Sequence, residues 1–289
     1  MNGTRSGPLA IVDATAPRMP SLEIDCALVA RWLEAFLHDE VVLRRNTQRA
    51  LVALSGGLDS AVVAFLCVRA FGPENVHAFR MPYRTSSPDS LADAQSVIDA
   101  LGCQSRTVEI SDAVDGYLQF EPDADGRRRG NVMSRMRMIV LFDQSAKLGA
   151  LPIGTGNKTE RLMGYFTWHG DDSPPVNPIG DLFKTQVRKL AEYLGVPQQV
   201  VSKAPSADLE ANQTDETDLG ITYAQADRIL SLMLGGYSDA KIAARGFAES
   251  DVALVRKRVE GTHWKRHLPT TAMLSNTAIN EFYLRPVDY

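Results

Sequence analysis

Two adjacent glycines between two apolar runs constrain this chain more than any other feature. The hexapeptide SGGLDS (residues 55–60) follows the apolar run 50–54 and precedes the run 61–66. This order predicts a buried strand, a glycine turn and a helix. Glycines let a backbone approach a ligand closely, and Ser60 is a residue type that caps helices. The turn therefore predicts an anion site made of backbone N–H groups and the positive end of a helix.

Asp59 adds a carboxylate beside this expected anion site, which suits Mg²⁺ carried by phosphates. The chain has no Gly-x-x-x-x-Gly-Lys-Ser/Thr segment, so the turn is not of the Walker type. Strand, SGGLDS and helix together resemble the pyrophosphate loop of the ATP pyrophosphatases, which split ATP into AMP and pyrophosphate to activate a substrate. The resemblance implies nucleotide binding.

Charge and composition narrow the function classes further. The net charge of −4 gives no general attraction to nucleic acid, and no apolar segment approaches the roughly 18 residues that span a membrane. The three cysteines are scattered, which argues against a paired-cysteine metal or redox site. Residues 1–20 have no signal-peptide pattern and are expected to form a loose arm, so we expect a cytoplasmic protein.

Apolar periodicity predicts an α/β fold of strands alternating with helices. This alternation implies a parallel sheet flanked by helices, with ligands at the carboxyl ends of the strands. We expect residues 21–289 to form one domain with a helical C-terminal extension. Strands are expected at 50–54, 75–79, 106–110 and 151–154, and helices within 21–45 and at 60–71, 89–101, 133–148, 222–234 and 249–260, with one more after Asp181 that ends at Gly195.

A second glycine-rich turn, GTGNKTE (154–160), follows the last expected strand. It suggests a backbone nest with Glu160 as a second carboxylate for magnesium, although taken alone it is compatible with a structural turn. The polar loops 84–90 and 205–209 either are simply solvated or close over a bound substrate. Two glycine turns on one sheet favour a shared nucleotide site.

Further blocks occur in the order found in ammonia-dependent NAD synthetases, and the chain resembles that family from about residue 50 to 270. Besides SGGLDS and GTGNKTE, the blocks are MPYR (81–84), Gly130-Asn131 with RMRM (135–138), Gly170-Asp171, KTQ (184–186), PSADL (205–209), DETDLG (215–220) and Lys265-Arg266.

The resemblance implies an adenine-nucleotide α-hydrolase-like fold and a ligase reaction. The carboxylate of deamido-NAD attacks the α-phosphate of ATP, giving an acyl adenylate and pyrophosphate, and ammonia then displaces AMP to give NAD. Mg²⁺ and a homodimer are implied as well. Because no glutaminase-like region precedes the loop, we expect free ammonia as the nitrogen source.

The resemblance also assigns roles to individual residues. Asp59, Lys184 and Asp171 would be catalytic, and Asp59 and Glu160 would ligate Mg²⁺. Deamido-NAD would contact Arg135, Trp168, Trp264 and Lys265. ATP would be bound by Ser55, Gly56, Gly57, Leu58, Asp59, Ser60, Arg80, Thr155, Lys184 and Ser206.

Three of these assignments have plainer alternatives. Lys184 in the first turn of a helix opposes the helix dipole, which favours a nearby phosphate over an ordinary surface lysine. Asp171 either accepts a proton from ammonium or caps a loop. Without the resemblance, Arg135 would be taken for a surface arginine.

The chain departs from the family pattern at three positions on the acyl-substrate side. Trp168 stands where a lysine is common, Pro175 where an aspartate is common, and Trp264 where a histidine is common. A tryptophan could stack on a pyridine or adenine ring. Either the same dinucleotide is held differently, or a related amide-forming ligase adenylates a different carboxylate.

Overall fold

A computed structural model describes residues 21–205, 214–267, 272 and 274 of the chain. The expected N-terminal arm (1–20) and the expected ATP contact Ser206 lie outside the described residues. No helix among the described residues is long and apolar enough to cross a membrane.

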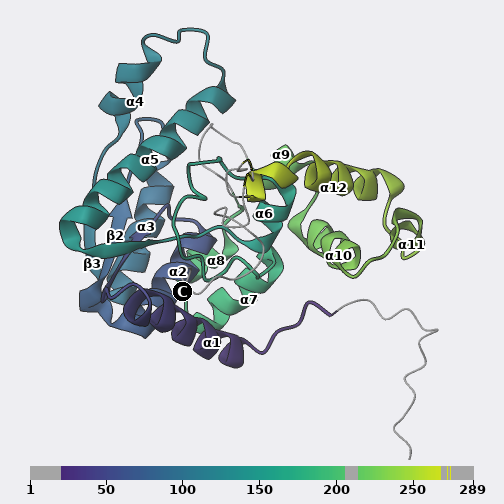
Figure 1. Cartoon of the computed structure of the whole chain (residues 1–289), viewed down its shortest axis with the longest axis horizontal. Helices are drawn as coiled ribbons and strands as arrows, with labels where there is room; N and C mark the ends of the chain where they lie inside the picture. The colour runs from purple at the N-terminus through teal and green to yellow at the C-terminus, as the bar shows by residue number, and fades with distance from the viewer. Residues whose placement is uncertain (1–20, 206–213, 268–271, 273, 275–289) are drawn as a thin grey trace, which may run out of the picture.

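The strands form a four-stranded parallel sheet with strand order β3-β2-β1-β4, which lies on the left in Figure 1. β1 pairs with both β2 and β4, so that Val52 is the register partner of Ala78 on one side and of Ile153 on the other. The expected α/β fold with a parallel sheet is confirmed. The strands are β1 (Arg49–Ala53), β2 (Val76–Arg80), β3 (Gln104–Thr107) and β4 (Ala150–Ile153).

Alternate residues of the central strands point to two different helical layers. Ala50 and Val52 pack into a core with α1, α2, α3, α7 and α8, whereas Leu51 packs with α4 and α5 on the other face. Both faces of the sheet are therefore buried, which explains the continuous apolar run 50–53 of β1. These helices are α1 (Cys26–His38), α2 (Leu58–Phe71), α3 (Pro88–Leu101), α4 (Ser111–Leu118), α5 (Gly126–Leu148), α7 (Lys184–Leu194) and α8 (Gln198–Ser202).

The expected helical C-terminal extension is present as a third core. Ile229 and Leu230 of α10 are fully buried with Val255 of α12 and Met163 of α6. In Figure 1, α10, α11 and α12 lie away from the sheet, on the opposite side of the molecule from α4. The helices are α6 (Lys158–Met163), α9 (Asp215–Leu219), α10 (Tyr223–Leu234), α11 (Asp239–Ala243) and α12 (Glu249–Gly261); short turns are η1 (Asp39–Leu43), η2 (Pro73–Asn75) and η3 (His263–Arg266).

Two elements differ from their expected positions. The strand expected at 106–110 is paired as β3 only over Gln104–Thr107, and all four of its residues are exposed. The helix expected from Met133 begins seven residues earlier, at Gly126, where Asp125 accepts a hydrogen bond from the N–H of Arg128. In both places the residues are polar, so the sequence has no apolar periodicity from which the strand or the helix start could be predicted.

Candidate active site

The SGGLDS turn connects β1 to α2 at the carboxyl end of the sheet. Gly56 has φ +83°, a conformation that favours glycine, and a Cβ there would lie 2.1 Å from the carbonyl oxygen of Ser90. The first helical residue is Leu58, one residue after the N-cap Gly57. Glycine at position 56 is thus required both by backbone conformation and by the close approach of α3.

Ser60 does not cap α2, contrary to the sequence-based expectation. It lies inside the helix, where its hydroxyl donates to the carbonyl of Gly57 (3.0 Å) and accepts from the N–H of Ser55 (3.3 Å). The two serine hydroxyls are 3.1 Å apart. Among the described residues no side chain caps α2, so its first-turn N–H groups are left to bind an anion.

Three charged side chains meet at this end of the sheet. The Lys184 ammonium contacts a carboxylate oxygen of Asp59 and lies 3.2 Å from Oε1 of Glu160. Lys184 is 5% exposed, so it is not an ordinary surface lysine. The three residues come from the first turns of α7, α2 and α6, and α2 and α6 follow the neighbouring strands β1 and β4.

The protonation of this cluster follows from its burial. Burial lowers the pKa of Lys184, but the Asp59 and Glu160 carboxylates outweigh burial and hold that pKa above its ordinary value. Burial raises the pKa of Glu160 to about 8, against the opposing effect of Lys184. Two acidic groups thus share a single ammonium, and the second carboxylate retains affinity for a proton or a further cation.

Asn157, which sequence analysis did not single out, joins both carboxylates. Its side-chain oxygen accepts from the N–H of Glu160 (3.0 Å), and its own N–H lies 3.3 Å from Oε2 of that glutamate, forming a capping box at the start of α6. Its amide nitrogen donates to Oδ1 of Asp59 (3.1 Å). The signal was present in the sequence, because Asn157 stands three residues before Glu160 at the start of a helix.

Two tyrosines and Asp215 complete the wall around the lysine. Tyr223 donates to Asp215 (3.0 Å), and its ring centre is 5.1 Å from the Lys184 ammonium. Tyr165 donates to Asp215 (3.2 Å) and to Asp218 (2.9 Å). Burial raises the pKa of the Asp215 carboxyl, while Lys184 lowers it. The DETDLG block therefore contributes a buried acid next to the charged cluster.

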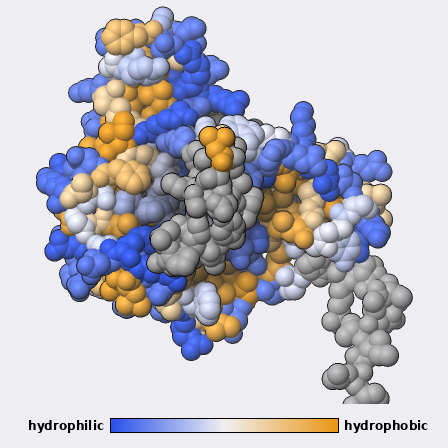
Figure 2. Space-filling view, in the orientation of Figure 1, coloured by the Kyte–Doolittle hydropathy of each residue, from blue (hydrophilic) through white to orange (hydrophobic). Residues whose placement is uncertain are grey.

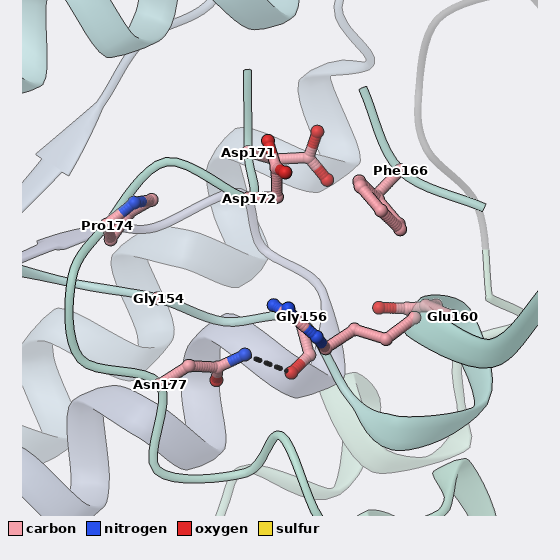
Figure 3. A pocket seen from close by; sticks show the side chains of 9 residues that line it. Gly154, Gly156, Glu160, Phe166, Asp171, Asp172, Pro174 and Asn177 are labelled. Carbon is pink, nitrogen blue, oxygen red and sulfur yellow. Dashed lines mark hydrogen bonds between the residues drawn. The ribbon is translucent and has the colours of Figure 1, made fainter. Parts of the chain in front are cut away.

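A small pocket adjoins the cluster and is shown in Figure 3. Asp171 and Asp172 line it on the side opposite Asn177, and Glu160 and Phe166 line it as well. Asp171 accepts hydrogen bonds from the N–H of Thr167 (2.8 Å) and from the Ser134 hydroxyl (3.1 Å), so it also fastens the loop that follows α6. The lining residues are Gly154, Gly156, Glu160, Arg161, Phe166, Asp171, Asp172, Pro174 and Asn177.

The residues expected to contact deamido-NAD come together in a separate group. The rings of Trp168 and Trp264 meet edge to face with centres 5.3 Å apart. Arg135 donates twice to the carbonyl of Trp168 (3.1 and 3.2 Å), and Lys265 donates to the carbonyl of Phe166 (2.5 Å). Burial lowers the pKa of Lys265. Pro175, the third position at which the chain departs from the family pattern, is exposed.

The last expected ATP contacts lie at the same end of the sheet. Arg80 is the final residue of β2 and donates to Gln95 of α3 (2.6 Å), and Thr155 follows β4. In the described part of the chain no three His, Cys, Asp or Glu side chains form a group that could hold a metal ion. Asp59 and Glu160 form a pair, and Mg²⁺ in phosphate-binding proteins is commonly held by one or two carboxylates together with substrate phosphates. These two residues therefore fit a metal that arrives with a nucleotide.

Comparisons with known proteins point to one family. The model of the NAD synthase family matches residues 29–269. An NH₃-dependent NAD⁺ synthetase of Trichlorobacter lovleyi is 49% identical over 263 residues, which is 91% of this chain and 96% of the relative.

Solved structures agree with the sequence comparison. The structure of an NH₃-dependent NAD synthetase of Campylobacter jejuni in complex with the nitrate ion is similar, with a TM-score of 0.75 and 30% identity over 87% of this chain and all of the other. That of an NMN synthetase of Francisella tularensis has a TM-score of 0.78 at 29% identity, over 86% and 99% of the two chains.

Proposed function

Because this chain belongs to the NAD synthase family, we infer that it joins ammonia to deamido-NAD in an ATP-dependent reaction that gives NAD, AMP and pyrophosphate. It is a ligase that forms a carbon–nitrogen bond and uses ATP as a co-substrate. The observation that carries the proposal is the meeting of Asp59, Glu160 and Lys184 beside a glycine turn with open helix N–H groups.

In the first step, the carboxylate oxygen of deamido-NAD attacks the α-phosphorus of ATP, and pyrophosphate leaves. The N–H groups of the SGGLDS turn and the Lys184 ammonium would stabilise the charge on the departing pyrophosphate. Lys184 would then exchange its carboxylate partners for phosphate oxygens. Arg80, Thr155 and Ser206 remain proposed ATP contacts.

In the second step, ammonia attacks the acyl carbon of the adenylate, and AMP leaves with the bonding electrons of the broken carbon–oxygen bond. The nitrogen must lose a proton for the amide to form. Asp171 lines the pocket beside Glu160 and is our candidate to accept that proton. Its hydrogen bonds from Thr167 and Ser134 fix the carboxylate in place.

Asp59 and Glu160 would hold Mg²⁺, which would neutralise charge on the ATP phosphates. Arg135, Trp168, Trp264 and Lys265 would contact the dinucleotide, with the tryptophan rings offering flat surface in place of the charged residues common in the family. We also propose a cytoplasmic location, because Cys26, Cys67 and Cys103 are all free thiols.

A homodimer belongs to the same proposal. Ile139 and Phe142 lie one turn apart on α5 and are 62% and 42% exposed. Figure 2 shows apolar side chains interspersed with hydrophilic ones on the part of the molecule formed by α4 and α5, and Tyr117 of α4 and the nearby Phe120 are exposed as well. An exposed apolar face of this kind supports contact with a second copy.

The function is tested by incubating the purified protein with ATP, Mg²⁺, ammonium and deamido-NAD and measuring NAD and AMP together. We expect equal amounts of both products, and we expect Asp59→Asn to abolish turnover while the fold survives. A parallel reaction with nicotinate mononucleotide tests the alternative carboxylate. The relative of Trichlorobacter lovleyi and the Campylobacter jejuni structure favour deamido-NAD, whereas the similar Francisella tularensis structure is of an NMN synthetase. Product from the mononucleotide alone would overturn the proposal.

A further inference from the structure

One fully buried carboxylate takes no part in the reaction described above. Asp227 is 0% exposed and lies on α10, a helix of the third core. A buried carboxylate is costly unless several donors satisfy it. The hydrogen-bond partners of Asp227 therefore indicate its structural role.

Within the described ranges, the hydrogen-bond partners of Asp227 lie at the starts of the two helices that carry Glu160 and Lys184. Oδ1 accepts from the hydroxyl of Thr159 on α6 (2.5 Å). Oδ2 accepts from the N–H of Thr185 on α7 (2.9 Å) and from the hydroxyl of the same residue (2.7 Å). One side chain from the helical extension thus binds α6 and α7 together.

These hydrogen bonds satisfy backbone N–H groups at the start of α7. Its N-cap residue is Phe183, whose side chain has no atom that could accept a hydrogen bond. The N–H of Lys184 donates instead to the Thr159 hydroxyl (3.0 Å), and this hydroxyl in turn donates a hydrogen bond to Asp227. The free N–H groups of α7 are thereby satisfied from α6 and α10, with a negative charge at the positive end of the helix.

We propose that Asp227 is a positioning residue of the ligase reaction: together with Thr159 and Thr185 it fixes the Lys184 ammonium relative to the Glu160 carboxylate. This group of three residues is called the Asp227 clamp below. Thr159 directly precedes Glu160, and Thr185 directly follows Lys184, so a shift at either hydroxyl moves a charged group of the site. Displacements of about 1 Å in a site can cost about a hundredfold in rate.

The inference rests on the proposed function, and its test uses matched variants. Thr159→Val has nearly the shape of threonine but lacks the hydroxyl, whereas Thr159→Ser keeps the hydroxyl. Asp227→Asn replaces one accepting oxygen by a donor. Ile229→Val, also fully buried on α10, weakens the same core without touching these hydrogen bonds. For each variant we would measure kcat, the KM of each substrate, the melting temperature and the calorimetric Kd for Mg–ATP.

We expect Thr159→Val and Asp227→Asn to lower kcat by at least about tenfold and to weaken Mg–ATP binding, with little change in the KM for ammonia. Thr159→Ser should stay within about threefold of the wild type, and Ile229→Val should lower the melting temperature without lowering kcat per folded molecule. If Thr159→Val matches Thr159→Ser in both kcat and Mg–ATP affinity, the clamp has no role in catalysis.

The outcomes separate this inference from the proposed function. A wild-type protein that makes no NAD overturns the function, and the Mg–ATP affinities then still decide whether the clamp positions the charged cluster. If Asp227→Asn does not fold, the pair of Thr159 variants decides alone. If the wild type makes no NAD, unchanged Mg–ATP affinity in Thr159→Val would overturn the clamp.

Discussion

Lys184 occupies an unusual place for a lysine, since its backbone opens a helix and its ammonium is buried. The helix dipole and burial both oppose a positive charge there, and the carboxylates of Asp59 and Glu160, with a smaller effect of Asp215, offset them. A buried ammonium held in this way can bind a ligand that carries more negative charge than a single carboxylate. The triphosphate of ATP has that property.

Asn157 serves two purposes that substitutions can separate. Asn157→Ser keeps an oxygen that can cap α6 but loses the amide that donates to Asp59. We expect kcat to fall about tenfold to a hundredfold, corresponding to about 1–3 kcal/mol for an unsatisfied buried partner. Asn157→Ala should lose a further ~1 kcal/mol of unfolding free energy with the cap. Steady-state kinetics and urea unfolding would check both, and wild-type kcat in Asn157→Ser would contradict the assignment.

His77 on β2 predicts a pH dependence of stability that is separate from the active site. Burial, with a smaller effect of Arg49, lowers the pKa of His77, and its Nε2 is buried with no hydrogen-bond partner among the described residues. Protonation therefore favours the unfolded chain. This contribution to stability is present above the unfolded-state pKa of about 6.5 and is lost as the pH falls from there through the lower folded-state pKa.

The comparison is between the wild type and His77→Gln, which does not titrate. Between pH 7.5 and 5.5 the wild type should lose more unfolding free energy than the variant, by no more than about 1.4 kcal/mol per pH unit, the limit for one proton. Urea unfolding at both pH values measures the difference. Parallel losses in the two proteins would show that His77 contributes nothing.

At the scale of elements, the SGGLDS turn depends on the close approach of α3. Gly56→Ala would place a methyl group 2.1 Å from the carbonyl oxygen of Ser90, so the turn or the helix must move. We expect a loss of about a hundredfold in kcat, because the phosphate-binding N–H groups move with the turn. Gly102→Ala is the matched control, since Gly102 also has a positive φ (+62°) but open space around it.

Gly102→Ala should cost only about 1 kcal/mol of unfolding free energy, with kcat unchanged. Kinetics and thermal unfolding of the two variants would be compared side by side. Equal activity of Gly56→Ala and Gly102→Ala would mean that the turn does not shape the nucleotide site.

Elements were predictable where burial leaves an apolar pattern. β1, β2 and β4 lie within one residue of their expected bounds, because strands buried on both faces are rich in apolar residues. β3 is exposed and therefore has no apolar pattern of its own. The strand was expected around Val108 and Ile110, which lie beyond the residues that pair in the sheet. α4 was missed, because only Val114 and Leu118 of its eight residues bury large apolar side chains.

The site was predictable only in part for the same reason. The two glycine turns can be recognised in the sequence. The contacts of Lys184 with Asp59 and of Asp227 with Thr159 cannot, because the spacing of residues along the chain does not indicate them. The resemblance to a family supplied Lys184. Asn157 and Asp227 were not supplied. The cap that Asn157 provides for α6 is local and could have been predicted, but its bond to Asp59 and the bonds of Asp227 depend on helices from different parts of the chain.

At the scale of the whole molecule, the exposed face of α5 predicts the oligomeric state. The double variant Ile139→Glu, Phe142→Glu should convert a dimer into a monomer near the chain mass of 31.7 kDa, because buried unpaired carboxylates disfavour the contact. Leu234→Glu, at an exposed apolar residue of α10, should remain dimeric. Light scattering after size-exclusion chromatography measures the masses. A double variant with the wild-type mass would exclude this face as the interface.

The hydrogen bonds that close the site join residues far apart in the chain: 98 positions separate Asp59 from Asn157, 125 separate Asp59 from Lys184, and 68 separate Thr159 from Asp227. Distant contacts form late in folding, because the entropy of the intervening loop must be lost first. During synthesis, SGGLDS leaves the ribosome well before α10. The catalytic centre is therefore completed late, and a chain interrupted before α10 would contain both carboxylates and the lysine without the means to align them.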